Sequence, residues 1–96
     1  MGAAQFIHVG FGKTAKEAFA SAYKEACYEY GNRGGTGTLA EKDEFTEIPL
    51  PVDKEPEPYA YELMQNSDDR VDDKYGPAGC FKIRDGEYMF FGWASE

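Results

Sequence analysis

The chain has 96 residues and carries 10 Lys and Arg against 18 Asp and Glu, a formal net charge of −8. This length suffices for one modest core, so we expect a single domain over residues 1–96 and exclude most large enzyme scaffolds. No apolar run approaches the ~18 residues that a membrane span needs, and the first residues lack the basic-then-apolar layout of a secretory signal. The sequence therefore predicts a cytoplasmic protein with no membrane partner.

The negative charge is concentrated in the middle of the chain. Residues 41–73 hold three Lys and Arg against twelve Asp and Glu, which gives this third a charge of −9. Such a surface repels phosphates, so we expect no direct binding to nucleic acid. Two interpretations stay open: a solvated face that keeps the domain soluble, or a negative surface that imitates DNA or docks on a basic partner.

A strand and a helix are predicted first along the chain. Alternating β-branched and aromatic residues predict a strand over residues 5–11, with Ile7 on one face and Phe6 on the other. Thr14 and Glu17 have the spacing of a capping box that begins a helix over residues 14–30. Four alanines lie on its apolar stripe, so the helix axis can approach a sheet closely. Gly31 favours the left-handed conformation that ends a helix.

The middle of the chain is less regular. Residues 38–41 and 45–52 have the composition of strands, and Pro49 and Pro51 in the second run suit a sheet edge. A weaker apolar pattern from Tyr59 predicts a short second helix, which extends towards Val71 in one interpretation.

The C-terminal quarter predicts a hairpin, because Asp85-Gly86 is a two-residue turn between strands over residues 80–84 and 87–94. The facing pairs expected from this turn are Arg84 with Glu87, Ile83 with Tyr88, and Phe81 with Phe90. The last strand is then aromatic on both sides and needs two covers: the long helix, and the second helix, a ligand or another copy of the chain. We therefore expect a homo-oligomer, most simply a two-fold dimer, assembled through residues 87–94.

Together these patterns predict an α+β fold. We expect an antiparallel sheet of four or five strands, with one long helix packed on a face and a second short helix.

Three motifs resemble catalytic or metal sites but lack an essential part. Gly12-Lys13 is similar to the end of a P-loop, but the glycine required five positions earlier is Ile7. The aspartates of residues 68–73 do not have the spacing of a calcium loop. His8 is the only histidine, and Cys27 and Cys80 form no CxxC or zinc cluster. We predict no catalytic residue, no metal and no cofactor, and favour a non-enzymatic protein.

The glycine-rich segment of residues 31–37 is the strongest candidate site. It holds four glycines in seven positions, and successive N–H groups without side chains can line a concave surface for anionic oxygens. Tyr30 or Trp93 would stack on a base while Arg33 and Lys42 contact phosphate. The candidate ligand-binding residues are Tyr30, Asn32, Arg33, Gly34, Gly35, Thr36, Thr38, Lys42 and Trp93. The alternative is a flexible connection from helix to strand.

Two blocks, residues 18–45 and 74–95, resemble small uncharacterised proteins of bacteriophage and bacterial genomes. The resemblance is carried by the segments YEYGNRGGTGTLAEK, KYGP and FFGWAS. It brings no catalytic residue with it. It implies a phage-like setting, in which small proteins act in host takeover or counter-defence.

Two functions follow as hypotheses. The leading one is a non-enzymatic protein that captures a small anionic, nucleotide-derived signalling molecule near residues 31–42, as in phage counter-defence. The alternative is a protein-interaction inhibitor that uses the acidic residues 41–73 to imitate DNA or to dock on a basic host protein.

Overall fold

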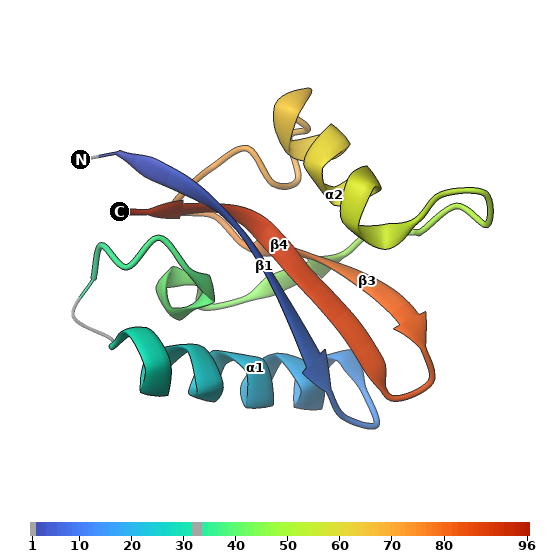
Figure 1. Ribbon diagram of the computed structural model, residues 1–96, viewed down its shortest axis with the longest axis horizontal. Helices are drawn as coiled ribbons and strands as arrows, with labels where there is room; N and C mark the ends of the chain where they lie inside the picture. Colours follow the sequence, from blue (N-terminus) through green and yellow to red (C-terminus); the bar gives the residue numbers. More distant parts are fainter. Residues whose placement is uncertain (1, 32–33) are drawn as a thin grey trace.

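The protein is described by a computed structural model that covers residues 2–31 and 34–96. Within these residues, four strands form one sheet that lies between two helices (Figure 1). The elements in chain order are β1 (Ala3–Phe11), α1 (Ala15–Tyr30), the 3₁₀ turn η1 (Leu39–Glu41), β2 (Phe45–Glu47), α2 (Pro56–Gln65), β3 (Ala78–Arg84) and β4 (Glu87–Ser95). The predicted α+β class is confirmed.

The sheet is mixed, so the prediction of a purely antiparallel sheet is wrong. The strand order is β1-β4-β3-β2, with β4 antiparallel to both of its neighbours. β2 pairs with β3 in the parallel direction, because α2 carries the chain across the sheet between them, as parallel pairing requires. β4 is therefore a central strand, and β1 and β2 form the two edges.

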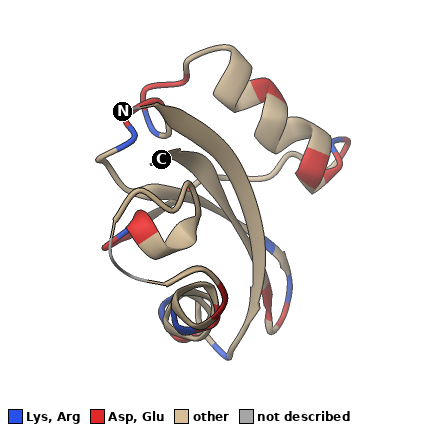
Figure 2. Ribbon diagram, turned by 60° about the vertical axis from the view of Figure 1, so that its left-hand side comes forward, with Lys and Arg blue, Asp and Glu red and all other residues tan. Residues whose placement is uncertain are grey.

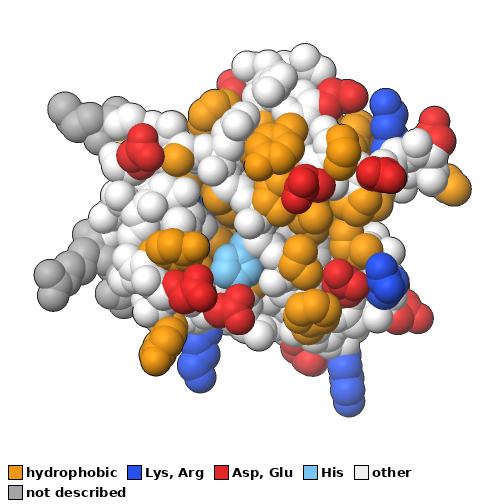
Figure 3. Space-filling view, viewed as in Figure 1, with side chains coloured by type: hydrophobic (Ala, Val, Ile, Leu, Met, Phe, Trp, Pro, Cys, Tyr) orange, Lys and Arg blue, Asp and Glu red, His pale blue; other side chains and the backbone are white. Residues whose placement is uncertain are grey.

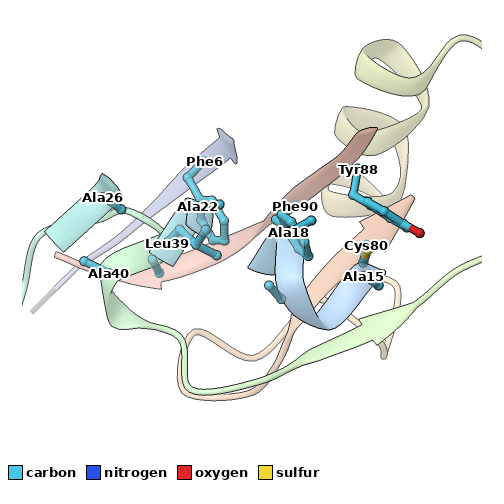
Figure 4. Close-up of a cluster of buried hydrophobic side chains, with 12 residues drawn as sticks. Phe6, Ala15, Ala18, Ala22, Ala26, Leu39, Ala40, Cys80, Tyr88 and Phe90 are labelled. Atoms are coloured by element: carbon cyan, nitrogen blue, oxygen red, sulfur yellow. The ribbon is translucent and has the colours of Figure 1, made fainter. Parts of the chain in front are cut away.

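The first helix begins and ends as the sequence predicts. Thr14 Oγ1 accepts a hydrogen bond from Glu17 N at 3.1 Å, and Gly31 at φ 85° ends the helix. α1 has 16 residues, which is an ordinary length and not the long helix expected. The side chains it buries against the sheet are all alanines: Ala15, Ala18, Ala22 and Ala26. Figure 4 shows them in one cluster with Phe6, Leu39 and Phe90.

The second helix covers the other face of the sheet (Figure 1). Ala60, Leu63 and Met64 of α2 are buried in one cluster with Phe81 and Phe91. The sequence left three possible covers for this face: the second helix, a ligand or another copy of the chain. In the structure, the second helix covers it. α2 ends at Gln65, with Asn66 as its C-cap, and does not reach Val71, because Ser67 takes a left-handed φ of 55° and turns the chain.

The hairpin register agrees with the prediction only at the turn. Arg84 lies opposite Glu87, and their side chains form an ion pair at 2.9 Å. An irregularity between Lys82 and Arg84 then shifts the register, so that Phe81 lies opposite Met89. Because a one-residue bulge moves the preceding side chains to the other face, Phe81 packs beneath α2 and not beside Phe90.

Two of the predicted strands differ from the structure. Residues 38–41 form a 3₁₀ turn and not a strand, because the Thr38 hydroxyl accepts a hydrogen bond from Ala40 N and caps it. Of residues 45–52, only Phe45–Glu47 form β2, at the sheet edge that suits the prolines that follow.

The acidic segment does not form one surface. Residues 41–73 begin beside α1 and continue through α2 on the opposite side of the sheet, so acidic residues appear on both sides (Figure 2). In the described parts of the chain, no helix is long and apolar enough to span a lipid bilayer.

Candidate binding sites

Within the glycine-rich segment, Thr36 binds a carboxylate of the protein itself. Thr36 donates to Glu41 Oε2 from its backbone N at 3.0 Å and from its hydroxyl at 2.8 Å. Burial raises the pKa of Glu41, but hydrogen bonds from the Thr36 and Gly35 backbone and the charge of Lys42 lower it below its ordinary value overall. At Thr36, the donors that were expected to bind an anionic ligand therefore bind the carboxylate of Glu41.

Lys42 is buried at 1% exposure, and its ammonium group binds a segment distant in the sequence. Its Nζ donates to the carbonyl oxygens of Asp73, Lys74 and Gly76 at 3.2, 3.2 and 3.0 Å. An ammonium group has three donors, so all of them are used. Burial lowers the pKa of Lys42 to about 8. Lys42 thus holds residues 73–76 in place.

The other predicted site residues are separated by the sheet. Trp93 packs on the α2 side, where its Nε1 donates to the Met64 carbonyl oxygen at 3.4 Å. Tyr30 and Thr38 lie on the α1 side. Gly34 and Gly35 are exposed at φ 91° and 72°, and Asn32 and Arg33 lie outside the described residues.

Tyr30 and Thr38 border a cavity of about 270 Å³ beside the outer edge of the sheet. The residues that line it are Gln5, Phe6, Ile7, His8, Tyr30, Gly37, Thr38 and Leu39. The imidazole of His8 also lines it, and His8 Nε2 lies 2.7 Å from Glu25 Oε1. The structure thus brings two of the predicted side chains, and neither Lys42 nor Trp93, to one hollow.

A second cavity, of about 470 Å³, lies between α1 and β2 and was not predicted from the sequence. Its walls are the rings of Phe19, Tyr23 and Phe45, with Phe19 and Phe45 centroids 5.2 Å apart. Both rings also pack against the buried Phe90, at 5.3 and 5.7 Å. The core therefore fixes these walls in place.

The rim of this aromatic cavity carries Asp43, Glu44 and Lys16. Asp43 and Glu44 are exposed, and the ion pairs found among the described residues involve neither of them. A hydrogen bond with Cys27 raises the pKa of Tyr23, and burial and the charge of Asp43 raise it further, so its hydroxyl is neutral. The cavity therefore combines aromatic walls with a net negative rim.

One sequence signal indicates this cavity in retrospect. Lys16, Phe19, Ala20 and Tyr23 have the spacing of one helix face, and Phe45 directly follows two acidic residues. The sequence does not show that β2 approaches this face, because that contact is set by the path of the whole chain.

Neither Asp68 nor Cys80 is available as a reactive group. Asp68 accepts two 2.8 Å hydrogen bonds from the guanidinium of Arg70, which lower the pKa of Asp68 to about 2. Burial raises the pKa of Cys80 to about 12, so its thiol is not a nucleophile at neutral pH. Among the described residues, no group of three or more His, Cys, Asp or Glu can hold a metal ion.

Comparison of the chain with protein-family models, with curated proteins and with solved structures finds no match. Its function has to be inferred from its cavities and from the exposed surface.

Proposed function

We propose that the protein is a non-enzymatic binding protein that docks on a basic partner protein, and that the aromatic cavity between α1 and β2 receives an arginine side chain of that partner. The proposal rests on one observation: three aromatic walls combined with two carboxylates that make no ion pair among the described residues. It develops the hypothesis of an acidic interaction inhibitor, with a defined cavity in place of a diffuse surface.

Guanidinium is the cation that suits these walls best. It is planar and weakly hydrated, so it stacks on aromatic rings while its edge donates to carboxylates. Phe19 and Phe45 supply the ring faces, and Asp43 and Glu44 are the acceptors at the rim. Lys16 opposes binding by one charge, but the net charge of −8 attracts a basic partner at long range.

A titration with short peptides tests this function. A capped peptide with two arginines should bind more tightly than the same peptide with two lysines, because an ammonium group does not stack. The double variant Asp43→Asn, Glu44→Gln should weaken binding of the arginine peptide about tenfold, or ~1.4 kcal/mol. The matched control is Asp69→Asn, Asp72→Asn, which removes the same charge from exposed positions outside the cavity.

Equal weakening in the two double variants would show that the attraction is diffuse and that the cavity is not the site. Absence of binding to the arginine peptide would exclude the proposed function.

A second candidate function is capture of a small anionic, nucleotide-derived molecule in the cavity beside Tyr30 and Thr38, in a counter-defence role. It is favoured by the position of that cavity next to the glycine-rich segment and by Tyr30, which is 55% exposed and free to stack on a base. Mass spectrometry of the supernatant after heat denaturation would detect a bound metabolite. Arg33→Ala should then abolish its retention without lowering the melting temperature.

A cytoplasmic location, a host protein as partner and assembly into a homo-oligomer belong to the same proposal. Assembly through residues 87–94 was expected to cover an aromatic face of the last strand, but α2 packs on that face and both edges of β4 are paired. A homo-oligomer would therefore assemble through a different surface of the molecule.

A further inference from the structure

The outer edge of β1 offers backbone groups that are unpaired among the residues that the structure describes. At the two ends of the β1–β4 ladder, Glu96 N donates to Gly2 O at 3.2 Å and Gly12 N donates to Gly86 O at 3.1 Å. Bonded pairs alternate along an antiparallel ladder, so the even-numbered residues of β1 bond to β4. The N–H and C=O groups that point outwards then belong to Ala3, Gln5, Ile7, Val9 and Phe11.

The β1 strand lacks the charges, prolines and bulges that normally prevent strand pairing. β1 is nine residues long, contains no Lys, Arg, Asp, Glu or Pro, and keeps a regular register with β4 throughout. Natural edge strands usually carry charges, prolines or bulges that block addition of another strand. A long, uncharged and regular edge is typical of a strand that receives a partner.

The same edge borders an incompletely covered apolar face. Ile7 and Val9 are only partly buried at the margin of the α2-side core, and Phe11 is 65% exposed. Figure 3 shows hydrophobic side chains gathered over this side of the molecule, from α2 towards the lower part of the sheet. A strand added beside β1 would extend the sheet and cover part of this face.

We infer that β1 pairs with β1 of a second copy, antiparallel and about a two-fold axis at Ile7. This register places Ile7 opposite Ile7, Gln5 opposite Val9, and Ala3 opposite Phe11. It is the one register that gives every outward group of β1 a partner, because Ile7 is the middle residue of Ala3–Phe11. The result is a closed, isologous dimer with one continuous sheet.

A second copy suits this edge better than a basic partner protein. β1 has no acidic residue to attract a basic strand, and its self-complementary register requires no other sequence. The net charge of −8 on each copy opposes pairing, but exposed charges are screened beyond roughly 8 Å at physiological salt. The dimer leaves the aromatic cavity free, because that cavity adjoins β2 at the opposite edge.

Sedimentation of the full chain tests the interface. We expect a mass near twice 10.7 kDa at micromolar concentration. Ile7→Lys places two ammonium groups opposite each other at the axis and should weaken the dimer by about tenfold or more. Val52→Lys introduces the same charge at a fully exposed position in the loop between β2 and α2, and should leave the dimer unchanged.

Amide hydrogen exchange of the unmodified protein gives a second readout that does not depend on a variant folding. The amides of Gln5, Ile7 and Val9 should become protected as protein concentration rises. Those of Phe6 and His8, which bond to β4, should be protected at all concentrations. A monomer throughout, a dimer in which the odd-numbered amides exchange freely, or a dimer insensitive to Ile7→Lys would each overturn the inference.

Discussion

The two faces of the sheet are covered to different extents. On the α1 face, a 16-residue helix buries only alanines, so it lies close enough for Ala18 O to come within 2.6 Å of a Cβ placed on Gly10. On the α2 face, a 10-residue helix leaves Ile7, Val9 and Trp93 only partly buried. The length of a helix and the size of its inward side chains thus decide how completely it covers a sheet.

The difference also locates the surfaces available for binding. The β1 edge and its apolar margin lie where α2 ends its coverage, and the aromatic cavity lies where α1 reaches the short β2. The two proposed interactions therefore use the two margins of the sheet: the β1 edge beyond α2, and the cavity that α1 forms with β2.

The largest effect is expected on the closely packed face. Ala22 is 1% exposed, so Ala22→Arg forces a charged side chain between helix and sheet and should lower the free energy of unfolding by about 3–5 kcal/mol. Ser21→Arg is the matched control, since Ser21 is the exposed neighbour on the same helix, and should change it by about 0.5 kcal/mol or less. Equal denaturation midpoints for the two variants would contradict the orientation of α1.

The next largest loss of stability is expected for Lys42, whose hydrogen bonds connect the end of η1, on the α1 side, to residues 73–76. Lys42→Met keeps the apolar stem but leaves three carbonyl oxygens without a donor, so we expect a loss of about 2–4 kcal/mol in urea denaturation. Lys82→Met removes an exposed lysine whose ion pair with Asp85 is on the surface, and should have a much smaller effect. Similar losses in both variants would show that the Lys42 contacts do not stabilise the fold.

The smallest effect is expected at the margin of the less covered face. Trp93→Phe removes a long 3.4 Å hydrogen bond and part of a half-buried ring, so it should destabilise the protein by about 1 kcal/mol or less. Phe91→Ala, in the fully buried core of the same strand, should cost about 3–5 kcal/mol. Thermal melting of both variants compares the two losses of stability. A loss for Trp93→Phe as large as that for Phe91→Ala would contradict weaker coverage by α2 towards β1.

Local signals were enough to predict several elements. The capping residues Thr14 and Glu17, the alanine stripe and Gly31 define α1, and Asp85-Gly86 defines the hairpin turn. The bulge near Ile83 could not be predicted, because it depends on how Phe81 packs beneath α2 and not on the turn. The parallel pairing of β2 likewise depends on the path of α2 across the sheet.

The candidate sites were less predictable than the fold. The glycine-rich segment was expected to bind a foreign anion, but a neighbouring side chain, Glu41, accepts the hydrogen bonds of Thr36. Lys42 is predicted to contact a ligand because it is a positive charge near the glycine-rich segment. The sequence does not indicate its actual partners, because the carbonyl groups of residues 73–76 are more than 30 positions away. The aromatic cavity brings Phe45 against Phe19, a contact between two separate segments.

The most direct measurement is a nuclear magnetic resonance titration of the labelled protein with the two-arginine peptide. We predict saturable shifts at Ala20, Tyr23 and Glu44, with the aromatic signals of Phe19 and Phe45 moving in parallel and Thr38 unaffected. Shifts confined to Tyr30 and Thr38, or no saturable shifts at all, would contradict the assignment of the aromatic cavity as the binding site.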